Sequence, residues 1–184
     1  LYVWQRQNHS VAILLREQFD IPERISGVLS HFCYGGRLFS RSSGRGHLLF
    51  LDTASLGAIN EGKRSSPVNA IHAECVIDQI KKLLTKGSVR PEQIGVLTPF
   101  TAQASFLEKN AKAAGLPQGI EFGTVHTFQG RLKNCLILDI TAAGVDYTYG
   151  SLVDDALVLA LMNSALSRCR TINSTEGRLI VIAD

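Results

Sequence analysis

The chain has 184 residues, of which 45% are hydrophobic and 19% charged, and this excludes a disordered protein and fits one domain with its own core. A net charge of +3 permits a nucleic-acid partner but is too small to indicate one. The sequence has no apolar run that could span a bilayer, no signal-peptide pattern and no initial Met, so we expect a fragment or excised domain without a membrane partner.

The four cysteines, Cys33, Cys75, Cys135 and Cys169, are widely spaced, and no two form a Cys-x-x-Cys pair. This spacing argues against a zinc site and against a disulfide framework. It predicts buried, reduced thiols in a cytoplasmic or nuclear protein.

The first third of the chain predicts two helical blocks followed by a strand. Apolar residues recur with helical spacing over residues 10–34, and Pro22 separates the two blocks, with Asp20 as the candidate N-cap of the second. Gly35 follows as the expected helix end, and residues 40–46 predict a flexible basic loop. The apolar run His47–Asp52 predicts a buried strand.

The rest of the chain alternates between helices and strands. Ser66 and Pro67 predict the start of a helix that continues to about Lys86. The further predicted elements are a strand at 94–97, a helix at 102–114, strands at 120–125 and 135–140, a helix at 153–168 and the final strand Arg178–Ala183.

Strands that alternate with helices of a dozen or more residues require crossover connections. They therefore predict a three-layer α/β domain with a mostly parallel sheet flanked by helices. In such sheets ligands bind at the carboxyl ends of the strands. Thr98, the loop at 126–131 and the segment after Ile140 are expected at these ends.

Two segments suggest a surface that faces phosphate groups. Residues 124–131 read Thr-Val-His-Thr-Phe-Gln-Gly-Arg between two apolar strands, and they bring a hydroxyl, an amide and a bare backbone to one edge. Arg168 and Arg170 lie near the end of a predicted helix, where the helix dipole alone can explain one cation. Two guanidinium groups also match the bidentate recognition of phosphate.

Other candidate sites are weaker. Residues 57–63 approach a phosphate-binding P-loop, but Arg64 follows Lys63 where a magnesium-binding hydroxyl is needed, so a solvated loop is predicted, and an independent P-loop phosphotransferase would depend on this segment alone. The five histidines are too scattered for a metal cluster, and His126 is expected to be a polar loop residue rather than a catalytic one. For Asp139 we expect a strand-end hydrogen bond.

Five motifs occur in an order that resembles a known family. Residues 18–25 match Gln-Tyr-Arg-Met-His-Pro-x-Ile, residues 32–38 match Phe-Tyr-x-Gly-x-Leu, and residues 94–100 match Ile-Gly-Ile-Ile-Thr-Pro-Tyr with a following Gln. Residues 124–133 match Ser-Val-Asp-x-Phe-Gln-Gly-Arg-Glu-Lys, and residues 163–170 match Asn-Val-Ala-Leu-Thr-Arg-Ala-Arg. The chain thus resembles the second (C-terminal) RecA-like domain of superfamily 1 DNA/RNA helicases, in the branch of the nonsense-mediated-decay helicase.

This resemblance implies a single RecA-like (P-loop NTPase-like) domain over residues 1–184, with 1–17 as a connection from a missing first motor domain. It implies that Arg168 is an arginine finger on the γ-phosphate of ATP. The implied ATP-binding residues are Gln18, Gln129, Gly130, Arg168 and Arg170. Those implied to contact single-stranded DNA or RNA are Thr98, Pro99, Gln103, Thr124 and His126. No metal ligand is implied here, since Mg²⁺ and most of the ATP contacts belong to the first motor domain.

The implied activity is that of an ATP-dependent helicase, in which this chain supplies the finger and part of the strand track, and the isolated chain is expected to be inactive. The sequence departs from the family pattern at Asp20, where the family has Arg, and at Leu132, where it has Glu. Ala160 and Leu161 replace two further arginines. These departures favour an alternative, a degenerate helicase module that binds nucleic acid or protein without ATPase activity.

Overall fold

Five strands form the central sheet, and each hydrogen-bonded pair within it is parallel. The computed structural model describes residues 15–42, 44–57, 61–63, 66–128, 130–141, 163–172 and 175–183. The strands of the sheet are β3 (His47–Asp52), β6 (Ile94–Thr98), β7 (Glu121–Thr124), β8 (Cys135–Asp139) and β9 (Arg178–Ala183). Their order across the sheet is β3-β9-β8-β6-β7. Every residue of β6 and β8 is buried, as the middle strands of a sheet covered on both faces must be.

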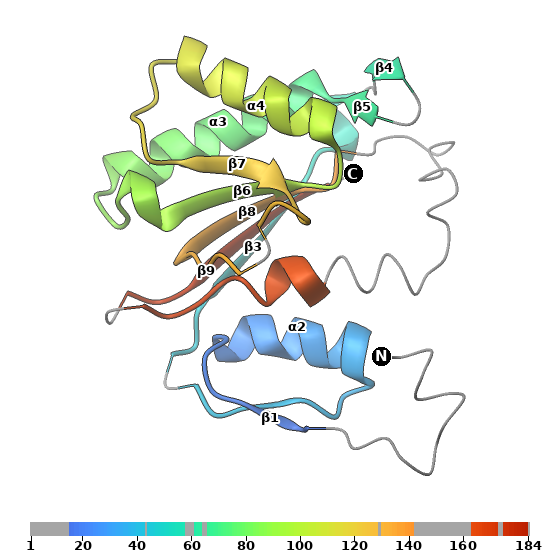
Figure 1. The fold of residues 1–184 in the computed structure, drawn as a ribbon, viewed down its shortest axis with the longest axis vertical. Helices are drawn as coiled ribbons and strands as arrows, with labels where there is room; N and C mark the ends of the chain where they lie inside the picture. Colours follow the sequence, from blue (N-terminus) through green and yellow to red (C-terminus); the bar gives the residue numbers. More distant parts are fainter. Residues whose placement is uncertain are drawn as a thin grey trace.

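Helices cover both faces of this sheet (Figure 1). Helices α3 (Ala70–Thr85) and α4 (Thr101–Ala113) lie on one face, and α2 (Glu23–Tyr34) lies on the other beside the helical residues 163–166. Side chains of β8 alternate between two cores: Ile137 packs with α3 and α4, whereas Leu138 packs with α2. The predicted three-layer α/β architecture is confirmed.

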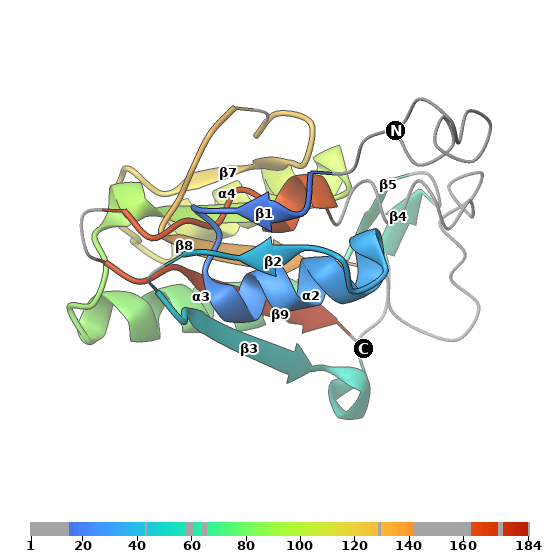
Figure 2. The ribbon, with the colours of Figure 1, turned by 90° about the horizontal axis from the view of Figure 1, so that it is seen from below.

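A small unit next to α2 contains two short strands. β1 (Glu17–Gln18) and β2 (Phe39–Ser40) pair in parallel, and α2 lies between this pair and the large sheet in Figure 1 and next to β2 in Figure 2. Ile25 and Leu29 of α2 are fully buried against the sheet. Gly35 adopts a left-handed conformation with φ of 58°, so α2 ends where the sequence predicts.

The start of this unit corrects two expectations. The helical pattern predicted over 10–34 fails at Glu17–Gln18, which form β1, and residues 10–14 lie outside the described part. Asp20 is not the N-cap, because Pro22 occupies that position without a side-chain cap. The amide oxygen of Gln18 instead accepts hydrogen bonds from the backbone N–H groups of Asp20 and Ile21 and thereby organises the turn before α2.

Two further predictions are wrong. β3 is not buried: it lies at one edge of the sheet, and Leu48, Leu49 and Phe50 are 40–59% exposed. The helix expected at Ser66 starts at Ala70, where the side chain of Asn69 accepts the N–H of His72 as an N-cap. The preceding residues form β5 (Ser66–Val68), which pairs antiparallel with β4 (Glu61–Lys63).

The β4–β5 pairing also decides the P-loop question. Lys63 lies in a strand, whereas a P-loop lysine lies where a loop meets a helix, so residues 57–63 do not form a P-loop. The solvated loop predicted over 57–63 is also wrong from Glu61 onward, where the chain forms β4.

Short 3₁₀ turns cover Ala54–Leu56 and Pro91–Gln93. Of the helix predicted at 153–168, residues 153–162 lie outside the described part, 163–166 are helical and 167–168 form a turn.

All four cysteines are free, but only Cys135 and Cys169 are buried as predicted, whereas Cys33 and Cys75 are half-buried. Burial raises the pKa of the Cys135 and Cys169 thiols to about 12, so both remain protonated. Within the described residues, no helix is long and apolar enough to cross a membrane.

The start of α2 packs closely against the loop at 44–46 and against Gly177. Gly46 has a φ of +71°, and a Cβ atom on it would lie 2.4 Å from Cβ of Pro22. A Cβ atom on Gly177 would lie 2.6 Å from Cγ of Pro22. The N–H groups of Glu23 and Arg24 donate to the carbonyls of Gly44 and Arg45 at 3.0 Å. The basic loop predicted as flexible is therefore fixed to α2 at these two residues.

Gly46→Ala is expected to lower the free energy of unfolding by about 2–3 kcal/mol, because it combines left-handed strain with overlap at Pro22. Gly27→Ala is the matched control: Gly27 lies within α2, its Cβ would meet nothing within 4 Å, and alanine should stabilise the helix by about 0.5–1 kcal/mol. Urea unfolding of the two variants checks both values. Equal effects of the same sign would contradict the packing described here.

Candidate nucleotide-binding and strand-binding site

The loop between β7 and β8 is anchored close to the carboxyl end of β7. Oγ1 of Thr127 accepts the N–H of Thr124 and donates to the carbonyl of Thr124, both at 2.9 Å. The ring of Phe128 is buried against two glycines, since a Cβ on Gly95 or Gly123 would lie 2.8 Å or 3.1 Å from it. His126 and Thr127 are exposed beside this anchor, and Gly130 has a φ of +81°. Gln129 lies outside the described residues.

Lys133 connects this loop to the arginine-containing segment. Its N–H donates to the carbonyl of Arg168, and its carbonyl accepts the N–H of Arg170, at 3.0 and 2.9 Å. The Lys133 side chain is 7% exposed, and its Nζ donates to the carbonyl of Glu92 at 2.6 Å and lies 3.1 Å from Glu121. Burial opposes ionisation of Glu121, but hydrogen bonds from Lys133 and Arg131 outweigh it and lower the pKa of Glu121.

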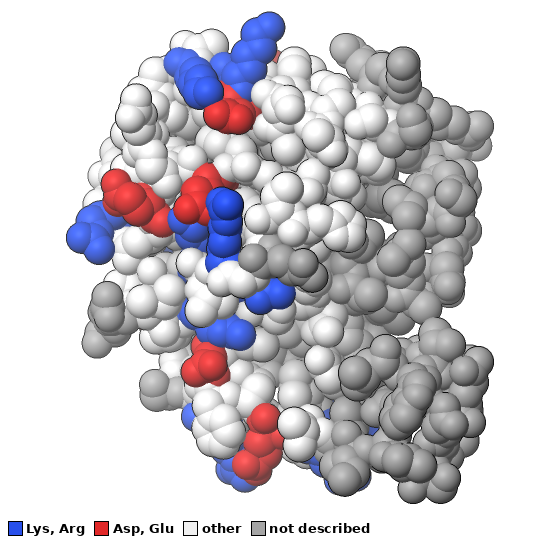
Figure 3. Space-filling view, viewed as in Figure 1, with Lys and Arg blue, Asp and Glu red and all other residues white. Residues whose placement is uncertain are grey.

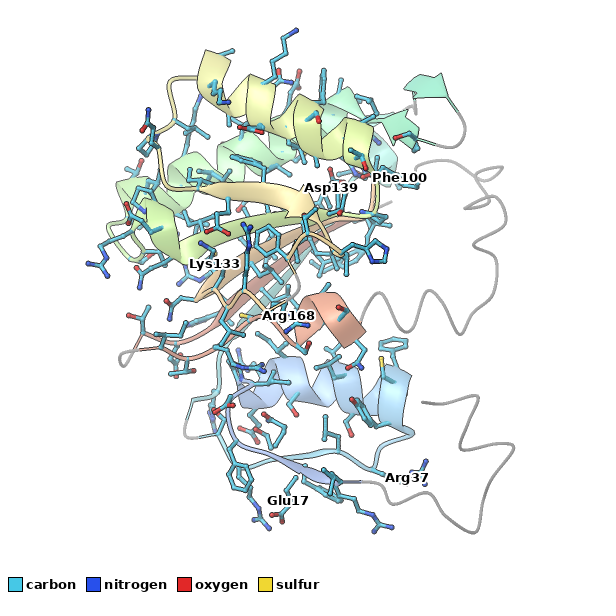
Figure 4. All side chains as sticks on the ribbon, in the orientation of Figure 1. Glu17, Arg37, Phe100, Lys133, Asp139 and Arg168 are labelled. Atoms are coloured by element: carbon cyan, nitrogen blue, oxygen red, sulfur yellow. The ribbon has the colours of Figure 1, made fainter. Side chains whose placement is uncertain are left out.

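Arg168 lies on the α2 side of the sheet, next to helical residues 163–166 (Figure 4). Its Nε atom is buried and has no hydrogen-bond partner in the part of the chain that the structure describes. An unpaired buried donor costs about 1–3 kcal/mol, more when charged, and an acceptor such as a phosphate oxygen would remove this cost. Arg168, which the sequence singles out, therefore has an unused buried donor among the described residues, as does the hydroxyl of Ser26.

Arg170, two residues further on, is half-buried. Burial lowers the pKa of Arg170, the Asp20 carboxylate counteracts this effect, and the positive charge of Arg168 adds to the lowering. The charges of Arg168 and Asp20 are thus close enough to Arg170 to affect its pKa. Among the described residues, no cluster of three or more His, Cys, Asp or Glu side chains could hold a metal ion.

Gln18 belongs to the same region but its amide is already engaged. Its oxygen holds the turn before α2, and its Nε2 donates to the carbonyl of Ile21 at 2.8 Å and to Oγ of Ser40 at 2.6 Å. Gln18 therefore fixes the turn that carries Asp20.

A second group of polar residues lies on the opposite face of the sheet, at the carboxyl ends of β6 and β8 (Figure 4). Asp139 is fully buried and accepts hydrogen bonds from the ring of His72 at 2.8 Å, from Nε2 of Gln103 at 2.7 Å and from the N–H of Thr141 at 2.7 Å. Thr53 Oγ1 lies 2.8 Å from the other ring nitrogen of His72. The expected strand-end hydrogen bond of Asp139 is confirmed.

Asn69 and Thr98 complete this group, which we call the Asp139 network. Asn69 Nδ2 donates to the carbonyl of Thr141, and its backbone exchanges two hydrogen bonds with the amide of Gln103. Oγ1 of Thr98 lies 2.6 Å from Oγ1 of Thr141, which has a φ of +68°. The Asp139 network holds a strained backbone in place where β8 ends.

The predicted strand-binding residues divide into two sets. The side chains of Thr98 and Gln103 are fully buried in the Asp139 network, and Thr124 is 8% exposed. Pro99 is half-buried, and His126 is exposed. Sequence reasoning missed His72 and Asn69, although an Asn three residues before a His at a helix start is a recognisable N-cap signal.

The fold places the protein in a class: it is an α/β domain of the RecA-like kind. A solved structure of the C-terminal domain of a possible DNA helicase from Lactobacillus plantarum WCFS1 superposes with a TM-score of 0.54, covering 90% of this chain and 87% of that chain at 12% identity. That likeness concerns the fold alone.

The sequence identifies the family. Residues 2–178 match the AAA domain family AAA_12, and the chain belongs to it. The chain is 28% identical to the DNA replication ATP-dependent helicase/nuclease DNA2 of Xenopus laevis over 123 residues, which cover 66% of this chain and 11% of that protein. It is 30% identical over 99 residues to the regulator of nonsense transcripts 1 homolog of Drosophila melanogaster, covering 51% and 8%.

The ATP-dependent helicase NAM7 of Saccharomyces cerevisiae is 32% identical over 92 residues, which cover 47% of this chain and 9% of that protein. The chain thus corresponds to about a tenth of the length of these relatives. Together these similarities confirm the predicted resemblance to the second RecA-like domain of superfamily 1 helicases.

Proposed function

We propose that residues 1–184 are the C-terminal motor half of an ATP-dependent superfamily 1 DNA/RNA helicase, and that Arg168 is its arginine finger. The observation that carries this proposal is the buried Nε of Arg168, which has no partner among the described residues and lies in a segment tied by Lys133 to the Phe128–Arg131 loop. A guanidinium group with a free donor fits the charge that develops on a transferred phosphoryl group.

ATP, bound between the two halves together with Mg²⁺, would supply the free energy for movement along single-stranded DNA or RNA. The missing first RecA-like domain would hold the P-loop and the magnesium ligands. In this half we assign ATP contacts to Gln129, Gly130 and Arg170, and we assign to Gln18 the support of the turn before α2. The isolated chain is therefore expected to lack ATPase activity.

For the strand contact, we assign direct contacts to Pro99, Thr124 and His126. Thr98 and Gln103 would act from within the Asp139 network by fixing the ends of β6 and the start of α4, because their side chains have no exposed surface. Backbone contacts of this kind position a strand without reading its sequence.

A second function is favoured by one specific observation. Asp20 places a negative charge close to Arg170, where the family pattern has an arginine. A carboxylate there opposes phosphate binding, as expected of a degenerate module that binds nucleic acid or protein without ATPase activity. The ATPase activity of the unmodified parent protein separates the two functions, because a motor half predicts activity and the degenerate module predicts none.

The purified chain is expected to bind single-stranded oligonucleotides weakly and with little sequence preference. On the face shown in Figure 3, lysines and arginines lie among acidic side chains, so we expect few phosphate contacts. With about three contacts, raising salt from 50 to 200 mM should weaken binding about 20-fold. Fluorescence anisotropy of labelled oligonucleotides over this salt range measures the effect.

His126→Asp should weaken this binding further, because it adds a negative charge beside the strand. His47→Asp is the matched control: it is the same substitution at an exposed position, at the amino end of β3 and away from the carboxyl edge. Binding that is independent of salt, or equal losses in the two variants, would count against this assignment of the strand track.

A further inference from the structure

One edge of the sheet is a long, apolar strand, and no described strand pairs with its outer side. Among the described residues, β3 pairs with β9 alone, so the other side of its six-residue backbone is open. The strand contains no Lys, Arg or Pro, and it exposes Leu48, Leu49 and Phe50 by 40%, 42% and 59%. Exposed edges of this length and composition pair readily with another strand.

The opposite edge shows the contrast. β7 has four residues, and its Glu121 forms ion pairs with Arg131 and Lys133 across the loop that follows. A short strand with a charged residue is protected against pairing with another chain. Among the described residues, the β3 edge is therefore better suited to pairing than the β7 edge.

At the β3 edge, the sheet presents apolar side chains on both of its faces. Leu49 lies next to Ile180 on the face covered by α3 and α4. Leu48 and Phe50 lie next to Leu179 and Val181 on the face covered by α2. A strand added at this edge would extend both cores at once.

We propose that β3 pairs antiparallel with β3 of a second copy of this chain, about a two-fold axis at Leu49. In this register Leu49 lies opposite Leu49 of the second copy and Leu48 lies opposite Phe50, so apolar side chains meet on both faces. The axis is normal to the sheet, which is the symmetry that antiparallel pairing of identical strands requires.

The ends of the strand support a second copy as the occupant. Asp52 lies at the carboxyl end, and the exposed Arg45 lies just before the amino end. Antiparallel pairing brings the acidic end of one copy next to the basic end of the other. The strand is therefore complementary to itself in charge as well as in apolar surface.

The test uses the purified chain and sedimentation velocity over a wide concentration range. A concentration-dependent dimer is expected. Leu49→Lys should raise its dissociation constant at least about tenfold, because two lysines then face each other at the axis. Leu56→Lys is the control, since Leu56 is 54% exposed and follows the strand without belonging to it.

Leu49→Glu should weaken the dimer in the same way, but an equal mixture with Leu49→Lys should recover it, because each Glu then faces a Lys. Thermal melts of the variants confirm that each is folded. A chain that stays monomeric throughout, including one that captures an extended peptide at β3 instead, overturns the proposal. So does a mixture without recovery, because recovery requires position 49 to lie at the axis.

Discussion

Replacing Arg168 by alanine in the parent protein with both motor domains is expected to lower kcat for ATP hydrolysis by about 10³–10⁵, or roughly 4–7 kcal/mol of transition-state stabilisation. Steady-state kinetics give this loss, and circular dichroism and oligonucleotide binding should remain close to those of the unmodified protein. Arg168→Lys should restore little, because an ammonium group cannot reproduce the bidentate guanidinium fork.

Arg170→Ala provides the comparison. Arg170 is assigned an ordinary ATP contact rather than the role of the finger, so its loss should cost only about 1.5–3 kcal/mol. The isolated chain is expected to be inactive, and it therefore gives the background rate of ATP hydrolysis. Small and equal losses at Arg168 and Arg170 would show that this segment is structural, and the degenerate module would then be the better account.

Asp139→Ala is expected to lower the free energy of unfolding of the isolated chain by about 3–5 kcal/mol, the largest stability effect that we expect of a single substitution here. The change leaves the buried donors of His72, Gln103 and Thr141 without their shared acceptor. Urea unfolding followed by circular dichroism measures the difference.

Asp52→Ala is a close control for this loss. Asp52 also ends a strand and accepts the N–H of the residue two positions later, Ala54, at 2.9 Å, but it is exposed. Its replacement should cost about 0.5–1.5 kcal/mol. Similar losses at the two positions would mean that the Asp139 network adds little beyond one strand-end hydrogen bond.

Periodicity and composition were enough to predict the α/β class and the strands at β6, β8 and β9, because each is a short apolar run between helices of ordinary length. At β3, whose sequence is equally apolar, they predicted the strand with its correct bounds but wrongly expected it to be buried. Strands of a parallel sheet are apolar whether they lie in the middle or at the edge, so a run such as His47–Asp52 carries no signal of its position. That position depends on which strand it pairs with.

The Asp139 network shows a second limit. Its members come from strand ends and helix starts as distant as Thr53 and Thr141, and only the closed sheet brings them together. The helix start at Asn69 was missed for a local reason, because Ser66 and Pro67 present a competing start signal three residues earlier. Arg168 was found because the motif around it is continuous in sequence.

The glycines beneath Phe128 have a consequence for how this family can diverge. Gly95 and Gly123 come from neighbouring strands and leave a hollow that one aromatic ring fills. A homologue cannot enlarge the residue at 95 or 123 while it keeps Phe at 128, and a smaller residue at 128 would leave a void that neither strand fills. A Cβ at 95 would also lie 2.9 Å from Cγ of Lys133, and one at 123 would lie 2.4 Å from Oγ1 of Thr127, so a smaller residue at 128 alone would make room for neither. We therefore expect relatives that lack either glycine to differ at several of these neighbouring positions as well.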